Sequence, residues 1–234
     1  MTTIAPPFLS ILCVTRVEPH VAPFLDAMLT LAKHCDAEFV VAADGFEAFE
    51  RLLAIRPLAD DAELACVHSR GYVESVLDYA LESVRGDWVL RLDDDERVNG
   101  PLGEWLEERA FVRDPLWSFR RLNLWGDADH ALETELLWPD PQTRLSVREL
   151  AGGRRSIHVA SPHGLGSWAP RPCALEHHKF LVKTLDERRA IATRYEAIEP
   201  GTGSGVFLPF SVPEDFYSEK VIAGKTKPVA EVVA

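Results

Sequence analysis

The 234-residue sequence predicts one α/β domain built on a mostly parallel β-sheet with helices on both faces. Three observations predict this class. Strand-like and helix-like segments alternate four times over residues 8–92. The strand-like segments are short, continuous apolar runs, as in strands that are buried on both faces. The composition, 47% hydrophobic and 26% charged residues, is that of a globular protein, and the length suits a single domain.

The elements follow from periodicity and from the residues that end each segment. Four strands are predicted at residues 8–15, 38–43, 64–68 and 88–92, and three helices at 23–34, 46–55 and 72–84. Pro57 is expected to stop the second helix, and Gly86 to end the third as a C-cap glycine. The second half is less regular, with strands predicted at 117–124 and 144–147, a helix at 181–198, a loop at 199–205 and a loose tail at 225–234.

Polar side chains follow these strands at the points where the strands end. Right-handed crossovers place the carboxyl ends of parallel strands at one edge of the sheet, where ligands of such sheets bind. Thr15, Arg16, Asp44, the segment 68–70 and the acidic run 93–96 are therefore expected to converge there, although they are distant in sequence.

The acidic run Asp93-Asp94-Asp95-Glu96 directly follows the fourth strand. Four consecutive acids repel one another unless a cation lies among them. Alternate side chains of an extended segment point the same way, so Asp93 and Asp95 could hold one Mg²⁺ or Mn²⁺ and leave sites open for phosphate oxygens. A solvated acidic loop that caps a helix would explain the same residues.

The charge is uneven along the chain. The net charge of −12 disfavours bulk binding of nucleic acid. Residues 144–194 nevertheless contain ten Arg and Lys against four Asp and Glu, a local charge of +6. Such a segment could receive a small anionic ligand, for example a nucleotide diphosphate. A solvated helix face around residues 179–194 explains these charges equally simply, and the charges alone favour that explanation.

Other features of the sequence bear on where the protein acts. The longest apolar run, residues 8–14, is shorter than the roughly 20 residues of a transmembrane helix and follows no basic region of a signal peptide. The four cysteines, Cys13, Cys35, Cys66 and Cys173, form no C-x-x-C pair and are expected to be reduced. We therefore expect a cytoplasmic protein without a transmembrane segment, and peripheral association with a membrane stays open.

Two stretches of the chain carry a resemblance to a known family. The segment 71–81, followed by residues 85–96 (Arg-Gly-Asp-Trp-Val-Leu-Arg-Leu-Asp-Asp-Asp-Glu), resembles the central block of family 2 glycosyltransferases, which have the GT-A fold. Residues 139–145, Ile157-His158 and 175–180 are similar to later blocks of the lipopolysaccharide-core-like branch. The resemblance covers roughly residues 8–198. It implies a single domain over residues 1–224, with a nucleotide-binding half at about 8–98 and an acceptor and metal half at about 99–224.

The resemblance also implies roles for individual residues. Asp95 would bind the divalent metal, Mn²⁺ or Mg²⁺, with Asp93 on the metal or the ribose, and the metal would bridge the diphosphate of a nucleotide sugar. A downstream histidine would complete the metal site. His177 matches best, and His178 is its neighbour. The remaining residues expected to bind the nucleotide sugar are Thr15, Arg16, Asp44, Arg70 and Asp94.

The general base is open. Inverting transfer needs a base on the acceptor hydroxyl, and Asp140 and His158 are the first candidates, with Glu135 and His163 behind them. The chain departs from the family pattern in three places. Ala43 precedes Asp44 where many relatives have two acids, Leu77-Asp78 replaces an Arg-Asn pair, and Val159 rather than an acid follows His158.

We therefore predict a metal-dependent, inverting transfer of a sugar from a nucleotide-diphosphate donor to the hydroxyl of an unidentified glycan, lipid-linked or small-molecule acceptor. Two alternatives remain at this stage. A nucleotidyltransferase of sugar phosphates would share the metal-bound sheet, but it usually carries a glycine-rich loop after its first strand, which residues 15–19 lack. A degenerate, non-catalytic nucleotide-sugar-binding protein would explain the departures from the family pattern.

Overall fold

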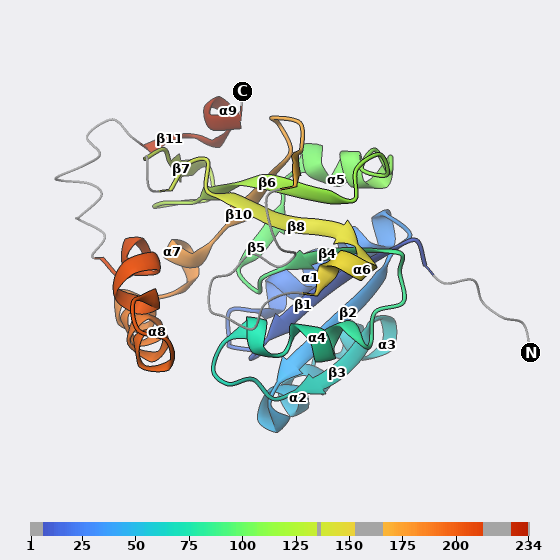
Figure 1. Cartoon of the computed structure of the whole chain (residues 1–234), viewed down its shortest axis with the longest axis horizontal. Helices are drawn as coiled ribbons and strands as arrows, with labels where there is room; N and C mark the ends of the chain where they lie inside the picture. The colour runs from blue at the N-terminus through green and yellow to red at the C-terminus, as the bar shows by residue number, and fades with distance from the viewer. Residues whose placement is uncertain (1–6, 135–136, 153–165, 213–225, 234) are drawn as a thin grey trace, which may run out of the picture.

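The computed structural model describes residues 7–134, 137–152, 166–212 and 226–233. Its first half shows the predicted alternation of strands and helices (Figure 1). The elements are β1 (Leu9–Thr15), α1 (Ala22–His34), β2 (Glu38–Asp44), α2 (Phe46–Leu53), α3 (Arg56–Asp61), β3 (Glu63–Val67), the 3₁₀ turn η1 (Val73–Ser75), α4 (Leu77–Leu81), β4 (Trp88–Leu92), β5 (Glu96–Val98) and α5 (Gly100–Glu107). All seven residues of β1 are buried, which explains its continuous apolar run.

The second half adds strands that return to the same sheet. Its elements are β6 (Leu116–Asn123), β7 (His130–Leu132), β8 (Pro141–Val147), α6 (Arg148–Ala151), β9 (Ser167–Trp168), β10 (Ala174–His177), α7 (Lys179–Val182), α8 (Leu185–Ile198), the π-helical turn η2 (Thr202–Val206), the 3₁₀ turn η3 (Leu208–Phe210), β11 (Thr226–Pro228) and α9 (Val229–Val233). The two predicted strands of this half are confirmed as parts of β6 and β8.

The sheet is mixed and mostly parallel. Within the described residues its order is β3-β2-β1-β4-β8-β6-β10-β5, with β9 paired to β6. Strands β3, β2, β1 and β4 are parallel, as predicted. Strand β8 runs antiparallel to both of its neighbours, β4 and β6, and β5 runs antiparallel to β10. The insertion of β8 beside β4 brings the second half of the chain against the acidic run.

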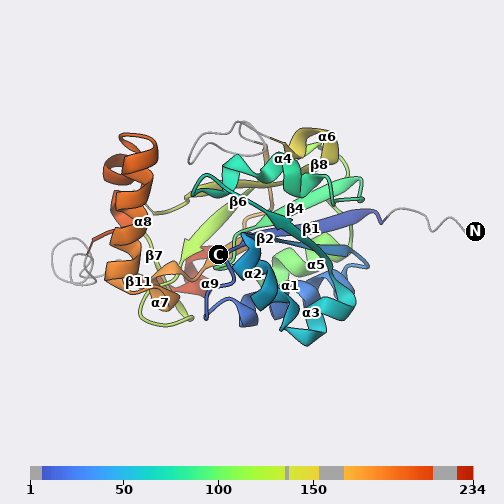
Figure 2. The same ribbon diagram turned by 90° about the horizontal axis from the view of Figure 1, so that it is seen from below.

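Helices cover both faces of the sheet, as predicted (Figure 2). On one face α1, α2, α3 and α5 cover a large core in which Leu25, Leu52 and Leu106 pack against strand residues such as Ile11 and Leu90. On the other face the small α4 packs through Leu77 and Ala80 on residues of β1, β2 and β4. The two cores hold the strands in place, and they therefore fix the positions of the strand ends at the edge of the sheet where the acids lie.

Three helix predictions differ in detail from the structure. The helix expected at 72–84 is divided into η1 and the short α4. The helix expected at 181–198 is divided at Thr184, whose hydroxyl and backbone amide form a capping box with Glu187, so that a new helix begins there. Pro57 was expected only to stop the second helix, but it also lies in the first turn of the next helix, α3. A proline costs no hydrogen bond in the first turn.

The prediction of a loose tail at residues 225–234 is wrong for the part that the structure describes. Strand β11 pairs antiparallel with β7, and α9 buries Val232 among Leu122, Leu124 and Ala174. The apolar residues of 229–233 cover the ends of β6 and β10, which explains why this short segment packs. All four cysteines are free, as expected, and no helix among the described residues is both long and apolar enough to cross a bilayer.

Candidate active site

A cavity of about 430 Å³ lies at the edge of the sheet where β1, β2 and β4 end. The strand ends and the acidic run form its charged floor. The opposite wall is formed by α8, which stands away from the sheet in Figure 1, and by the segment 206–210. That wall is mainly apolar and aromatic, with Ile191, Tyr195, Phe207 and Phe210. The convergence predicted from the strand ends is therefore confirmed for Thr15, Arg16, Asp44 and the aspartates 93–95, which all line this cavity.

Hydrogen bonds join the ends of β1, β2 and β4 across the floor. The Thr15 hydroxyl donates to Asp94 Oδ2 at 2.7 Å. Arg16 Nε donates to Asp44 Oδ2 at 3.0 Å, and the backbone amide and hydroxyl of Ser69 also donate to Asp44, at 2.7 and 2.6 Å. Burial alone would raise the pKa of Asp44, but the bonds from Ser69 and Arg16 hold it below its usual value. Asp44 is therefore an ionised acceptor at neutral pH.

Two arginines neutralise part of the acidic run. Arg144 of β8 donates to Asp93 and, at 2.9 Å, to Glu96 Oε1, and Arg121 of β6 lies 3.2 Å from the same Glu96 oxygen. Glu96 is completely buried. Burial, with the neighbouring Asp93, raises the pKa of Glu96 to about 8. The two arginines therefore supply part of the positive charge that offsets the repulsion among these acids.

Asp95 faces a different partner. Its Oδ1 atom lies 3.5 Å from Nε2 of His177, and both side chains are almost fully buried. The other ring nitrogen of His177, Nδ1, lies 2.6 Å from the side-chain oxygen of Asn123. The amide nitrogen of Asn123 donates to Leu137 O and to Asp140 Oδ2, so the oxygen end of that amide must accept from Nδ1–H. We therefore assign the tautomer that carries its proton on Nδ1.

This tautomer leaves a lone pair on Nε2, which faces a carboxylate oxygen. Burial, with the charge of Arg121, lowers the pKa of His177 to about 3, so the ring is neutral at pH 7. Burial alone would raise the pKa of Asp95, but the ammonium of Lys179 holds it well below the usual range, so Asp95 is ionised. Nε2 is buried and has no hydrogen-bond partner. Two facing acceptors with no proton between them fit a divalent cation.

The protein supplies only part of a coordination shell. No group of three or more His, Cys, Asp or Glu residues that could hold a metal ion exists in the described parts of the chain. Asp95 and His177 are two ligands of the kinds that Mn²⁺ accepts, and an ion there would need further oxygen ligands from a bound molecule or from water. A site of this kind binds its metal well only together with an anionic ligand.

Asp140, the first candidate for the general base, also lines the cavity. Its Oδ2 accepts from Arg121 Nε at 2.8 Å and from Asn123 at 3.0 Å, and its Oδ1 accepts from Gln142 at 2.9 Å. Burial would raise the pKa of Asp140, but Arg121 and Asn123 keep it below its usual value. The carboxylate is therefore charged and fixed in orientation, and it is a weaker proton acceptor than a free aspartate.

Two of the described residues that were expected at the site, His178 and Arg70, do not line the cavity. The ring of His178 packs on Phe24 of α1, with 5.1 Å between centroids, and its Nε2 lies 3.8 Å from Glu176. His178 contacts Asp95 through its backbone amide, which donates to Asp95 O, and the ring that faces the Asp95 carboxylate is that of His177. Arg70 is exposed and does not line the cavity. His158 lies outside the described residues, as do Glu135 and His163.

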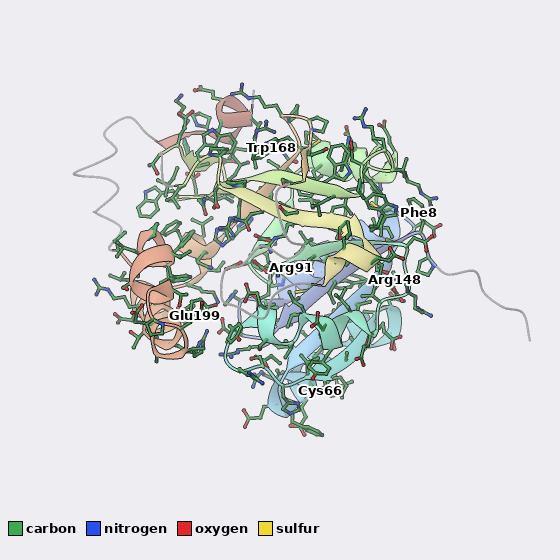
Figure 3. All side chains as sticks on the ribbon, in the orientation of Figure 1. Phe8, Cys66, Arg91, Arg148, Trp168 and Glu199 are labelled. Carbon is green, nitrogen blue, oxygen red and sulfur yellow. The ribbon has the colours of Figure 1, made fainter. Side chains whose placement is uncertain are left out.

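Sequence reasoning missed most of the cations of the site. Arg144, Lys179, Lys183 and Arg194 all line the cavity, and all belong to the basic segment 144–194. The charge of that segment was the available signal, and the explanation of residues 179–194 as a solvated helix face is wrong for Lys179, Lys183 and Arg194. Arg91 of β4 also lines the cavity, with its Nε and Nη1 buried and unpartnered, near the middle of the molecule (Figure 3). No periodicity distinguishes it from other polar residues of a strand.

The sheet order and the helix layers, together with the likeness to the solved structures described next, define an α/β protein with the GT-A fold. No family model matches the sequence, and no curated protein matches it.

Solved structures match over most of the chain. The mannosyltransferase PcManGT from Pyrobaculum calidifontis, in complex with GDP-Man and Mn²⁺, is 16% identical with a TM-score of 0.52, over 92% of this chain and 72% of that one. TarS from S. aureus is 14% identical with a TM-score of 0.50, over 91% of this chain and 45% of TarS. A TarS 1–349 structure in complex with UDP-GlcNAc is also 14% identical, with a TM-score of 0.46, over 91% and 76%. The likenesses to PcManGT and to TarS at a TM-score of 0.50 establish the fold, and they do not single out a lipopolysaccharide-core-like branch.

Proposed function

We propose that this protein is a glycosyltransferase that transfers a sugar from a nucleotide-diphosphate donor to an acceptor hydroxyl, with inversion and with the help of Mn²⁺ or Mg²⁺. The observation that carries the proposal is the pair formed by the Nε2 lone pair of His177 and the Asp95 carboxylate, 3.5 Å apart beside a cavity at the strand ends. The fold supports it, because the similar PcManGT structure holds a nucleotide sugar and Mn²⁺.

The residues of the floor divide into two groups in this proposal. Asp44, Thr15 and Arg16 lie at the ends of β1 and β2, where they would bind the base and the ribose. Asp95 and His177 would hold the metal, which when bound supplies positive charge to the diphosphate oxygens. Asp93 and Asp94 border the same site, but Asp93 is bound by Arg144 and Asp94 by Thr15. We therefore give Asp93 an orienting role rather than that of a metal ligand.

Asp140 is the base that we propose. The acceptor oxygen would form its bond to the anomeric carbon with a lone pair, while the bond from that carbon to the diphosphate oxygen breaks and leaves its electron pair on the diphosphate. The acceptor proton would pass to a carboxylate oxygen of Asp140. The bond from Gln142 to Oδ1 and the bonds from Arg121 and Asn123 to Oδ2 keep this carboxylate in one orientation.

Product analysis tests the reaction class. The protein would be incubated with UDP- and GDP-sugars and Mn²⁺, in a screen that first ranks donors by thermal shift, because a ligand that binds the folded state raises its apparent stability. We expect release of a free nucleoside diphosphate. Release of pyrophosphate with a sugar phosphate and a nucleoside triphosphate as substrates would indicate a nucleotidyltransferase. Donor binding with neither transfer nor hydrolysis would indicate a non-catalytic binding protein.

A pair of adjacent histidines provides a matched test of the metal site. His177→Gln should weaken Mn²⁺ binding in the presence of the nucleoside diphosphate by at least about tenfold, because it removes one of two protein ligands. His178→Gln should leave Mn²⁺ binding unchanged, because that ring packs on Phe24. The reverse order, measured by titration calorimetry, would move the site away from Asp95.

A further inference from the structure

Lys179 lies immediately after the strand that carries His177, at the first position of α7. Its Nζ atom lines the cavity, 3.8 Å from Asp95 Oδ2 and about 5 Å above the rings of Phe207 and Phe210 (5.0 and 5.1 Å to the centroids). Its side chain is 17% exposed. The two rings attract the ammonium group but supply no hydrogen-bond acceptor to it.

The two oxygens of the Asp95 carboxylate therefore face two different sites for a positive charge. Oδ1 faces the lone pair of His177, and Oδ2 faces the ammonium of Lys179. A divalent cation bound at the first position would lie within several ångströms of Lys179, and two cations at that separation repel each other strongly in a partly buried site. Binding of the metal therefore weakens the ion pair between the Asp95 carboxylate and the Lys179 ammonium.

Three other cations of the cavity are held more firmly than Lys179. Lys183 donates to Glu18 at 2.5 Å, and Arg121 donates to Asp140 at 2.8 Å and to Glu96. Arg144 donates to Asp93 and Glu96. Lys179 lies beyond hydrogen-bond distance of Asp95, and its flexible stem allows the ammonium to move within the cavity. Among these lysines and arginines it is the one that can move to a new anion without breaking a short bond.

We propose that Lys179 is a movable counter-ion, paired with Asp95 in the free protein and transferred to the diphosphate when a divalent cation takes Asp95. This inference rests on the proposed function and adds a catalytic residue to it. Lys179 acts through its charge and takes no part in the proton transfer. It stabilises the electron pair that the leaving diphosphate oxygen receives when its bond to the anomeric carbon breaks.

The test is Lys179→Met, which keeps the length of the side chain and removes the charge. Mn²⁺ alone, titrated by electron paramagnetic resonance, should bind the variant about tenfold more tightly than the wild type, because a competing cation has gone. With saturating Mn²⁺, inorganic pyrophosphate, UDP and GDP should bind at least about tenfold more weakly, and turnover should fall by about a hundredfold. A role that is only structural would weaken both kinds of binding together.

Two controls keep the result interpretable. Lys33→Met removes an exposed lysine paired with Asp61 and should change neither Mn²⁺ nor pyrophosphate binding. Lys179→Arg keeps the charge and should keep the weak Mn²⁺ binding of the wild type. Unchanged or weaker Mn²⁺ binding by a folded Lys179→Met, or unchanged pyrophosphate binding, would overturn the inference.

The same titrations separate the inference from the proposed function. If pyrophosphate binding depends on Lys179 but no nucleotide sugar is bound or turned over, the anion role of Lys179 stands and the proposed function fails. If the wild type transfers a sugar with Mn²⁺ while Lys179→Met keeps wild-type Mn²⁺ and pyrophosphate affinities, the function stands and the inference fails.

Discussion

At the scale of single residues, Asn123 decides which nitrogen of His177 faces the acids. Its amide is fixed by bonds to Leu137 O and Asp140 Oδ2, so its oxygen holds the proton of His177 on Nδ1. The lone pair of Nε2 then points to Asp95. Asn123 would therefore act by positioning His177 and not as a metal ligand itself.

Asn123→Leu should therefore lower Mn²⁺ affinity by about 10–100-fold, because His177 loses the bond that fixes its tautomer and orientation. Electron paramagnetic resonance of Mn²⁺, with pyrophosphate present, measures this. Thr30→Ala is the control, because the exposed Thr30 hydroxyl donates to Asp26 O of its own helix α1 and the substitution should leave Mn²⁺ affinity unchanged. An Asn123→Leu variant that is folded and binds Mn²⁺ like the wild type would show that the tautomer is not important.

The residues that the sequence predicted are those that end parallel strands or match a family block. Thr15, Asp44 and the aspartates 93–95 follow from strand ends, and His177 from the block at residues 175–180. Arg121 and Arg144 were not predicted, because they reach Glu96 only through the position of β8 between β4 and β6. No local pattern encodes that long-range pairing.

At the scale of elements, Glu38 ties the beginnings of β1 and β2 to the turn before β4. Its carboxylate accepts from Ser10 Oγ at 2.6 Å and from Arg85 N at 2.9 Å, and Ser10 Oγ accepts from Gly86 N at 2.8 Å. A side chain on Gly86 would meet Ser10 within 2.5 Å, so a glycine is required there. These bonds set the register of the strands whose other ends form the site.

Glu38→Gln should lower the free energy of unfolding by about 1–2 kcal/mol at pH 7. The exposed Arg85 contributes little of this. Burial would raise the pKa of Glu38, but Ser10 and Arg85 hold it below 4.5. A lowered folded-state pKa contributes stability above the unfolded value and loses it as pH falls.

The difference between wild type and Glu38→Gln should therefore shrink as the pH falls below about 4.5. Urea denaturation at several pH values measures this. The exposed Glu63→Gln serves as control and should differ little from the wild type at any pH. A difference that is constant with pH would mean that the charge of Glu38 is unimportant.

Element boundaries show where sequence reasoning fails. The long apolar runs predicted β1, β2 and β4 well, because burial on both faces leaves a continuous signal. Strands such as β5 and β10, with three and four residues, are too short to show a period, and their pairing with each other and with β6 defines them.

At the scale of the whole molecule, the end of the described chain packs against two strands that carry residues of the site. Val232 of α9 is 1% exposed and packs with Leu122 and Ala174, which lie on the strands that carry Asn123 and His177. The prediction of a loose tail failed because the five residues of α9 are too few to show a helical period. The apolar surface that they cover belongs to strands that are distant in sequence. The parallel part of the sheet, β3-β2-β1-β4, was predictable from the βα alternation of the first half, and the antiparallel strands of the second half were not.

Val232→Ala should lower the free energy of unfolding by about 2 kcal/mol through the cavity it leaves. Urea denaturation measures this. Val112→Ala, at a position that is 55% exposed, should stay within about 0.5 kcal/mol of the wild type. Equal effects of the two substitutions would show that α9 does not pack in solution as it does here.

The central claim is that Asp95 and His177 hold a divalent cation against a diphosphate. Anomalous scattering at the manganese edge, from crystals grown with MnCl₂ and either UDP or GDP, tests it most directly. The account predicts one strong peak about 2.0–2.3 Å from both Asp95 Oδ1 and His177 Nε2, in contact with diphosphate oxygens. A nucleotide bound in the cavity with no manganese between these two atoms, or a peak elsewhere in the molecule, would contradict it.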